Sequence, residues 1–93
     1  MRLELIIKPE AEAEIEDSFD WYELQAEGLG YDFVHNVEQT LEAIEVMPFG
    51  YQIVHRELRR AIVHRFPHSI LYLEGPTIYV VACVHRNEIP KFG

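Results

Sequence analysis

Residues 59–86, RRAIVHRFPHSILYLEGPTIYVVACVHR, decide the fold predicted for this chain. Apolar and polar residues alternate along this stretch, and Pro67-His68 and Gly75-Pro76 interrupt it in the way that turns do. The pattern predicts three consecutive strands joined by tight turns, at 59–66, 69–74 and Thr77–His85. The last of these is apolar on both faces, so we expect it to lie in the middle of a sheet.

A further strand and two helices are predicted ahead of these three strands. Residues 3–8 are apolar and alternate enough to form a strand, which Pro9 ends while suiting the first turn of a helix. Apolar residues then recur three and four positions apart, which predicts helices over about 9–27 and about 31–46. Gly28-Leu29-Gly30 leaves so short a connection that the helices should be antiparallel neighbours.

The order of these elements predicts the fold class. Residues 49–58 are expected to form a connection, with a short extended piece at 51–54. The order is then β-α-α-β-β-β, which predicts a single α+β domain over residues 1–93. In that domain a two-helix hairpin packs on one face of a mostly antiparallel four-stranded sheet.

Composition narrows the class of protein. The chain is 48% hydrophobic and 26% charged, as is ordinary for a globular domain. It has no apolar run of the ~18 residues that a membrane span needs, and its N-terminus does not resemble a signal peptide. We therefore expect a cytoplasmic protein that makes no membrane contact. The single cysteine, Cys83, is predicted to be a buried core residue, since it lies in an apolar strand.

Charge is distributed unevenly along the chain. The net charge is −8. Residues 1–50 carry 13 acidic side chains and two basic ones, whereas residues 51–93 carry three acidic and six basic ones. Either the acidic helices and the basic sheet attract each other within the fold, or the sheet meets an acidic partner. The overall negative charge argues against a protein that binds nucleic acid directly when alone.

The sequence predicts neither a metal site nor a cofactor. His64, His68 and His85 share the strand region, but their spacing matches no known set of zinc ligands. Neither Ser18 nor Ser69 lies in the context of a catalytic nucleophile.

One cluster of basic and aromatic residues remains as a candidate site, because adjacent strands could bring several of its members together. Its members are Arg59, Arg60, His64, Arg65, Tyr72, His85 and Arg86. Arginine, histidine and tyrosine could together polarise a phosphodiester and shuttle protons without a metal. The alternative is that the arginines extend from the sheet and pair with carboxylates.

A series of short motifs then carries a family resemblance. In chain order they are Trp21-Tyr22, Gly28-Leu29-Gly30, Phe33, Pro48, Arg59-Arg60, Phe66-Pro67, Tyr72, His85-Arg86 and Pro90. Through these motifs, nearly the whole chain resembles the RelE/ParE superfamily of bacterial type II toxins, in particular its ParE-like, plasmid-stabilisation branch. The β-α-α-β-β-β order of that family matches the order predicted here.

The resemblance implies a toxin that is neutralised by a cognate antitoxin, whose C-terminal segment docks as a helix in a groove or adds a strand to a sheet edge. ParE-like members poison DNA gyrase and arrest growth, whereas RelE-like members cleave mRNA on the ribosome. RelE-like nucleases have a basic residue early in the middle strand of the three, where this chain has Ser69 or its neighbour His68. The C-terminal tail also lacks the tyrosine that such nucleases often carry.

We therefore predict first a ParE-like toxin that is not an enzyme and acts by protein–protein contact on gyrase. Its target or antitoxin contacts are predicted to be Arg59, Arg60, Arg65, Tyr72, His85 and Arg86. The alternative is a metal-independent endoribonuclease, with His64, Arg65, His85 and Arg86 as catalytic residues. A non-toxic relic that only binds antitoxin is a third interpretation. An uncovered edge strand could also pair two copies into a homodimer.

Overall fold

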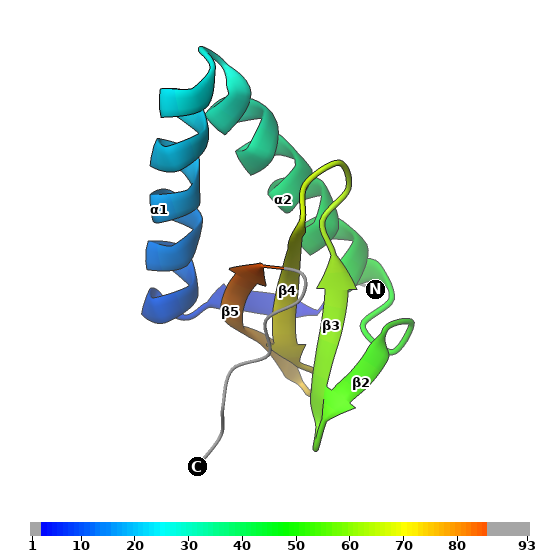
Figure 1. Ribbon diagram of the computed structural model, residues 1–93. Helices are drawn as coiled ribbons and strands as arrows, with labels where there is room; N and C mark the ends of the chain where they lie inside the picture. Colours follow the sequence, from blue (N-terminus) through cyan, green and yellow to red (C-terminus); the bar gives the residue numbers. More distant parts are fainter. Residues whose placement is uncertain (1–2, 86–93) are drawn as a thin grey trace.

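The computed structural model describes residues 3–85 and places two helices on one face of a five-stranded sheet (Figure 1). The elements are β1 (Glu4–Ile7), α1 (Pro9–Gln25), α2 (Leu29–Val46), β2 (Gln52–His55), β3 (Leu58–Ile62), β4 (His68–Leu73) and β5 (Thr77–His85). The strand order is β1-β5-β4-β3-β2, with β1 parallel to β5 and all other pairs antiparallel. The predicted α+β fold, with its helical hairpin and central last strand, is confirmed.

The sheet has one strand more than the predicted four. The extended piece expected at 51–54 is β2, which pairs with β3 and forms the far edge of the sheet. The predicted strand at 59–66 is shorter, because the chain turns after Ile62. Arg65 has a φ of 72°, and the Val63 N–H donates to the His68 carbonyl oxygen at 2.9 Å. This turn lets both Val63 and Phe66 reach the core, which a continued strand would not allow.

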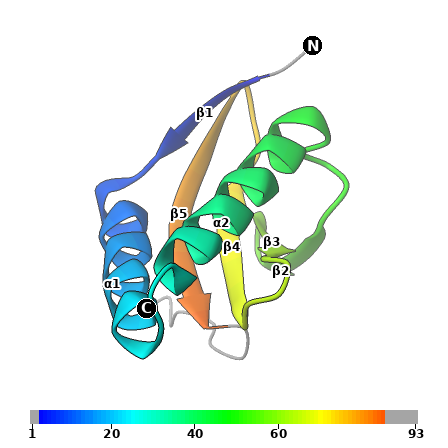
Figure 2. The same cartoon turned by 90° about the horizontal axis from the view of Figure 1, so that it is seen from above.

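The connection between the helices depends on two glycines. Gly28 has a φ of 87°, which favours glycine, and it lets α2 begin at Leu29, two residues earlier than predicted. Gly30 lies so close to α1 that a Cβ there would be 2.6 Å from the Phe19 carbonyl oxygen. The Gly30 N–H also donates to Glu23 Oε1 at 2.8 Å. These contacts fix the crossing of the two helices (Figure 2).

The main core lies between the helices and the sheet. The helices contribute apolar side chains that are almost fully buried, and α2 supplies most of them: Phe33, Val37, Leu41 and Ile44, with Ala11 and Tyr22 from α1. Burying a side chain of this size stabilises the fold by about 1.5–3 kcal/mol. No helix within residues 3–85 is long and apolar enough to cross a membrane.

A β-bulge in β5 decides which of its residues face the helices. Leu71 pairs with Ala82, but Tyr72 pairs with Val80, so Val81 is an extra residue in β5. Strict alternation would place Cys83 on the face opposite Val80. With the bulge, both side chains belong to the core beneath the helices, while Ala82 packs on the other face. His85, two residues beyond Cys83, is thereby directed to the helix-covered face as well.

Candidate functional site: a groove between α1 and β5

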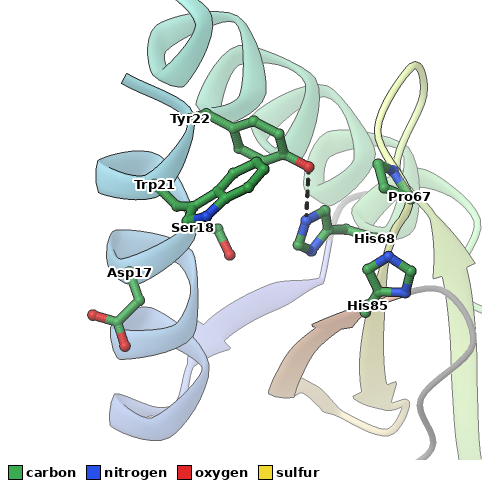
Figure 3. A pocket seen from close by; sticks show the side chains of 7 residues that line it. All are labelled: Asp17, Ser18, Trp21, Tyr22, Pro67, His68 and His85. Atoms are coloured by element: carbon green, nitrogen blue, oxygen red, sulfur yellow. Dashed lines mark hydrogen bonds between the residues drawn. The ribbon is translucent and has the colours of Figure 1, made fainter. Parts of the chain in front are cut away.

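Two neighbouring cavities lie between α1 and the end of the sheet at which β5 finishes. The first has a volume of about 430 Å³ and is lined by Asp17, Ser18, Trp21, Tyr22, Pro67, His68 and His85 (Figure 3). The second, of about 490 Å³, is lined by Glu14, Asp17, Ser18, His68, Cys83, Val84 and His85. Because four residues line both cavities, we treat them as one feature, the α1–β5 groove.

One end of the groove is aromatic. The Tyr22 hydroxyl and His68 Nε2 form a hydrogen bond of 3.0 Å that joins α1 to β4 (Figure 3). The His68 ring also packs against Phe33, with centroids 4.9 Å apart, and lies 5.9 Å from the His85 ring. Burial is the main cause that raises the pKa of Tyr22, and the electrostatic effect of the nearby Cys83 raises it further. The Tyr22 hydroxyl therefore stays protonated near neutral pH. Trp21 is 57% exposed at the rim.

The other end of the groove follows an edge of β5 that no strand covers within residues 3–85. β1 pairs only with Thr77, Ile78, Tyr79 and Val80, and the chain leaves the sheet where the Lys8 N–H donates to the Val80 carbonyl oxygen at 2.9 Å. Beyond that point the Cys83 N–H donates to Glu14 Oε1 at 2.9 Å. A side chain of α1 thus occupies the position that the backbone carbonyl of a neighbouring strand would take.

Cys83 is a core residue, as predicted. Its side chain is 3% exposed. Burial, and then the nearby Glu14 carboxylate, raise the pKa of its thiol to about 12. Because the thiolate is the nucleophilic form, this thiol is inert near neutral pH.

Two of the predicted contact residues are engaged inside the fold. Tyr72 is fully buried, and its hydroxyl donates to the Pro48 carbonyl oxygen at 2.6 Å. Burial raises its pKa to about 12. Arg59 donates from Nη1 to the Tyr51 carbonyl oxygen at 2.6 Å and pairs with Glu74 at 3.6 Å. These side chains fasten the segment after α2 to the sheet, so Tyr72 does not line a contact surface in this structure.

The remaining predicted residues lie in different places. Arg60 is half-buried and, by the alternation of β3, shares the face of Leu58, away from the helices. His64 and Arg65 are exposed in the turn between β3 and β4. His85 lines the groove. Arg86 lies outside the described residues. Of the predicted residues that are described, only His85 therefore reaches the groove.

The groove also contains residues that the sequence did not single out as a site. Trp21 and Tyr22 were identified only as one motif of the family resemblance, and His68 was assigned to a predicted turn. The pairing of His68 with His85 follows from the register of the last hairpin, but that register includes the bulge, which no residue type in the sequence signals. Within residues 3–85, no group of three or more His, Cys, Asp or Glu side chains could hold a metal ion.

Comparison of the folds agrees with the predicted resemblance. The chain is similar to a chain of a solved structure described as the chromosomal ParDE TA system from P. aeruginosa, with a TM-score of 0.80 and 15% sequence identity. The match covers 90% of this chain and 96% of that chain. No model of a protein family matches the sequence, and no curated protein does so. The chain therefore shares its fold with that chain of a ParDE system, as the resemblance predicted.

Proposed function

We propose that this chain is the toxin of a ParE-like type II toxin–antitoxin pair. In this proposal a cognate antitoxin neutralises it in the cytoplasm, and the free toxin inhibits DNA gyrase by protein–protein contact. The observation that carries the proposal is the similarity in fold to a chain of a ParDE system over almost the whole of both chains. At 15% identity that similarity concerns the fold, so the target and the antitoxin are part of the proposal.

The electrostatics of the groove support contact with a protein over cleavage of RNA. Glu14 and Asp17 line the groove, and their carboxylates repel the phosphates of a nucleic acid. Arg59, a cation that could neutralise phosphate, is held by Glu74 and by the backbone at Tyr51. The two carboxylates make the groove better suited to a protein than to an RNA strand, and Arg59, which lies outside the groove, already has its partners within the fold.

Controlled expression tests the toxin proposal. Induction of the chain alone in a bacterial host should arrest growth, and co-expression of the small gene product encoded beside it should restore growth. Normal growth under strong induction of the folded protein would contradict the proposal and favour the non-toxic relic that only binds antitoxin.

Pairing of two copies into a homodimer stays a prediction. Light scattering on the purified protein measures its mass in solution and so tests this prediction.

The His68–His85 pair favours a second candidate, the metal-independent endoribonuclease. The two rings lie 5.9 Å apart, and Tyr22 is hydrogen-bonded to one of them. Two imidazoles at this spacing could act as general acid and base in cleavage of a phosphodiester. Primer-extension mapping after induction separates the candidates: new mRNA 5′ ends in a host with translating ribosomes support the nuclease, and intact mRNA during growth arrest excludes it.

A further inference from the structure

We propose that the α1–β5 groove binds a linear polyamine, with one ammonium group on the aromatic rings of the groove and another beside the carboxylates of α1. This proposal does not depend on the proposed toxin function. Three features of the groove support it: a row of rings, two carboxylates that lack a cation, and a length that suits a ligand with two charged ends.

A row of rings crosses the first cavity from α1 to β5 (Figure 3). Trp21 and Tyr22 of α1 have ring centroids 5.1 Å apart. The next centroid distances are 5.7 Å from Tyr22 to His68 and 5.9 Å from His68 to His85. The planes of neighbouring rings differ by 83°, 69° and 61°, so the row is no flat stack and presents ring faces in several directions. The face of an aromatic ring attracts an ammonium group, and Trp does so most strongly.

Two carboxylates of α1, those of Glu14 and Asp17, line the second cavity. Glu14 Oε1 accepts the hydrogen bond from the Cys83 N–H at 2.9 Å. A carboxylate accepts several hydrogen bonds, so Glu14 can keep this contact and also meet an ammonium group. Within residues 3–85 the ion pair found joins Arg59 to Glu74, so neither carboxylate of the groove is paired with a Lys or Arg of that part of the chain.

The cations of the described part of the chain lie away from the groove. Residues 9–55 contain 12 acidic side chains and no Lys or Arg. Three cations from other segments stack on rings that line neither cavity: Lys8 on Tyr79, Arg59 on Phe49 and Arg65 on Phe66. Among residues 3–85, no Lys or Arg lines either cavity. These residues therefore supply rings and carboxylates to the groove, and the cation that both attract has to come from a ligand.

The groove is longer than a single ammonium group needs. Glu14 lines only the second cavity and Trp21 only the first, and α1 rises by about 10 Å between them. Ser18 lies between these residues and lines both cavities, and its hydroxyl can accept a hydrogen bond from an ammonium group. The ligand that fits therefore carries ammonium groups joined by methylene chains, as the triamine spermidine does.

Calorimetric titration of the intact chain tests the proposal. The probes are spermidine, butylamine and an uncharged diol of the same length as spermidine. Spermidine should bind saturably at one site per chain, and the diol should not bind. Butylamine should bind at least about tenfold more weakly than spermidine, because it has one ammonium group and cannot use both ends of the groove. The chain has a single tryptophan, Trp21, so a change in its fluorescence on titration with spermidine places the ligand at the ring-lined end.

Paired substitutions separate a specific site from general attraction to an acidic protein. Asp17→Asn should weaken spermidine binding by about threefold, as expected for one exposed charge, whereas Glu38→Gln, which removes an exposed acid from α2, should leave it unchanged. Trp21→Ala should also weaken binding by about threefold, whereas Leu24→Ala, on the same helix, should leave it unchanged. All four side chains are exposed, so the substituted proteins should keep the fold.

Three results would overturn the inference. They are absence of saturable spermidine binding at millimolar concentrations, equal binding of butylamine and spermidine, and equal losses of binding in Asp17→Asn and Glu38→Gln. Equal binding of butylamine would mean that the groove takes one ammonium group, such as a lysine side chain of a partner protein offers. None of these measurements uses gyrase or growth. Their failure therefore leaves the proposed toxin standing, and a failed growth assay leaves the polyamine site standing.

Discussion

The hydrogen bond from Tyr72 to Pro48 allows a direct test of whether Tyr72 is a structural or a contact residue. Tyr72→Phe removes the hydroxyl that donates to the Pro48 carbonyl oxygen at 2.6 Å, in a place where both residues are buried. The ring stays and leaves no large cavity. The cost is therefore that of an unsatisfied buried carbonyl, about 1–3 kcal/mol in the free energy of unfolding.

Urea unfolding followed by the fluorescence of Trp21 measures this cost. For a domain of this size the m-value is about 1 kcal/mol per M, so the midpoint should fall by about 1 M or more. Tyr79→Phe is the matched control, because Tyr79 is 39% exposed and no hydrogen bond of its hydroxyl is found within residues 3–85. Its effect should stay within about 0.5 kcal/mol. An unchanged midpoint for Tyr72→Phe, together with weakened binding of gyrase or antitoxin, would refute the structural role.

Three further perturbations test the fold around the groove. Gly30→Ala should destabilise the protein by about 1–3 kcal/mol, because its Cβ would meet the Phe19 carbonyl oxygen at 2.6 Å; unchanged urea unfolding would contradict this packing. Deletion of Val81 removes the bulge but keeps Cys83 and His85 on the face of Val80, because without the extra residue strict alternation places all three on one side. The Tm should therefore fall by less than about 8 °C, and a fall well beyond that value would show that the bulge itself is needed for stability. Burial raises the pKa of Cys83 from 9.0 to about 12, so its thiol stays protonated in the fold while the unfolded chain ionises. The contribution of Cys83 to the free energy of unfolding should therefore be constant below pH 9 and be lost between pH 9 and 12. The Cys83→Ala variant should lose less stability over that interval, and an identical decline would show that the thiol is not responsible.

The sequence predicted the layers of the fold because periodicity reports burial. Apolar residues three and four apart marked both helices, and alternation marked the strands that became β1, β4 and β5. The pattern did not predict β2 as a full strand, since Gln52 and Ile53 are exposed at the sheet edge and carry little signal of burial.

The candidate site was harder to predict than the fold. Arg59 and Tyr72 are residue types that functional sites favour, but their partners are backbone carbonyls at Tyr51 and Pro48, which no sequence pattern places nearby. The groove itself depends on the bulge at Val81. A single extra residue reverses the face of everything after it, so alternation alone assigns Cys83 and His85 to the wrong side.

The central claim is that a protein with this fold inhibits gyrase by contact. The most direct measurement is DNA supercoiling by purified gyrase, with the purified chain added in increasing molar excess. The proposal predicts loss of supercoiling and accumulation of trapped cleavage complexes, both reversed by the cognate antitoxin. The contradicting result is a chain that arrests growth in cells but, when purified, folded and added in molar excess, leaves gyrase with full supercoiling activity and no trapped cleavage complex.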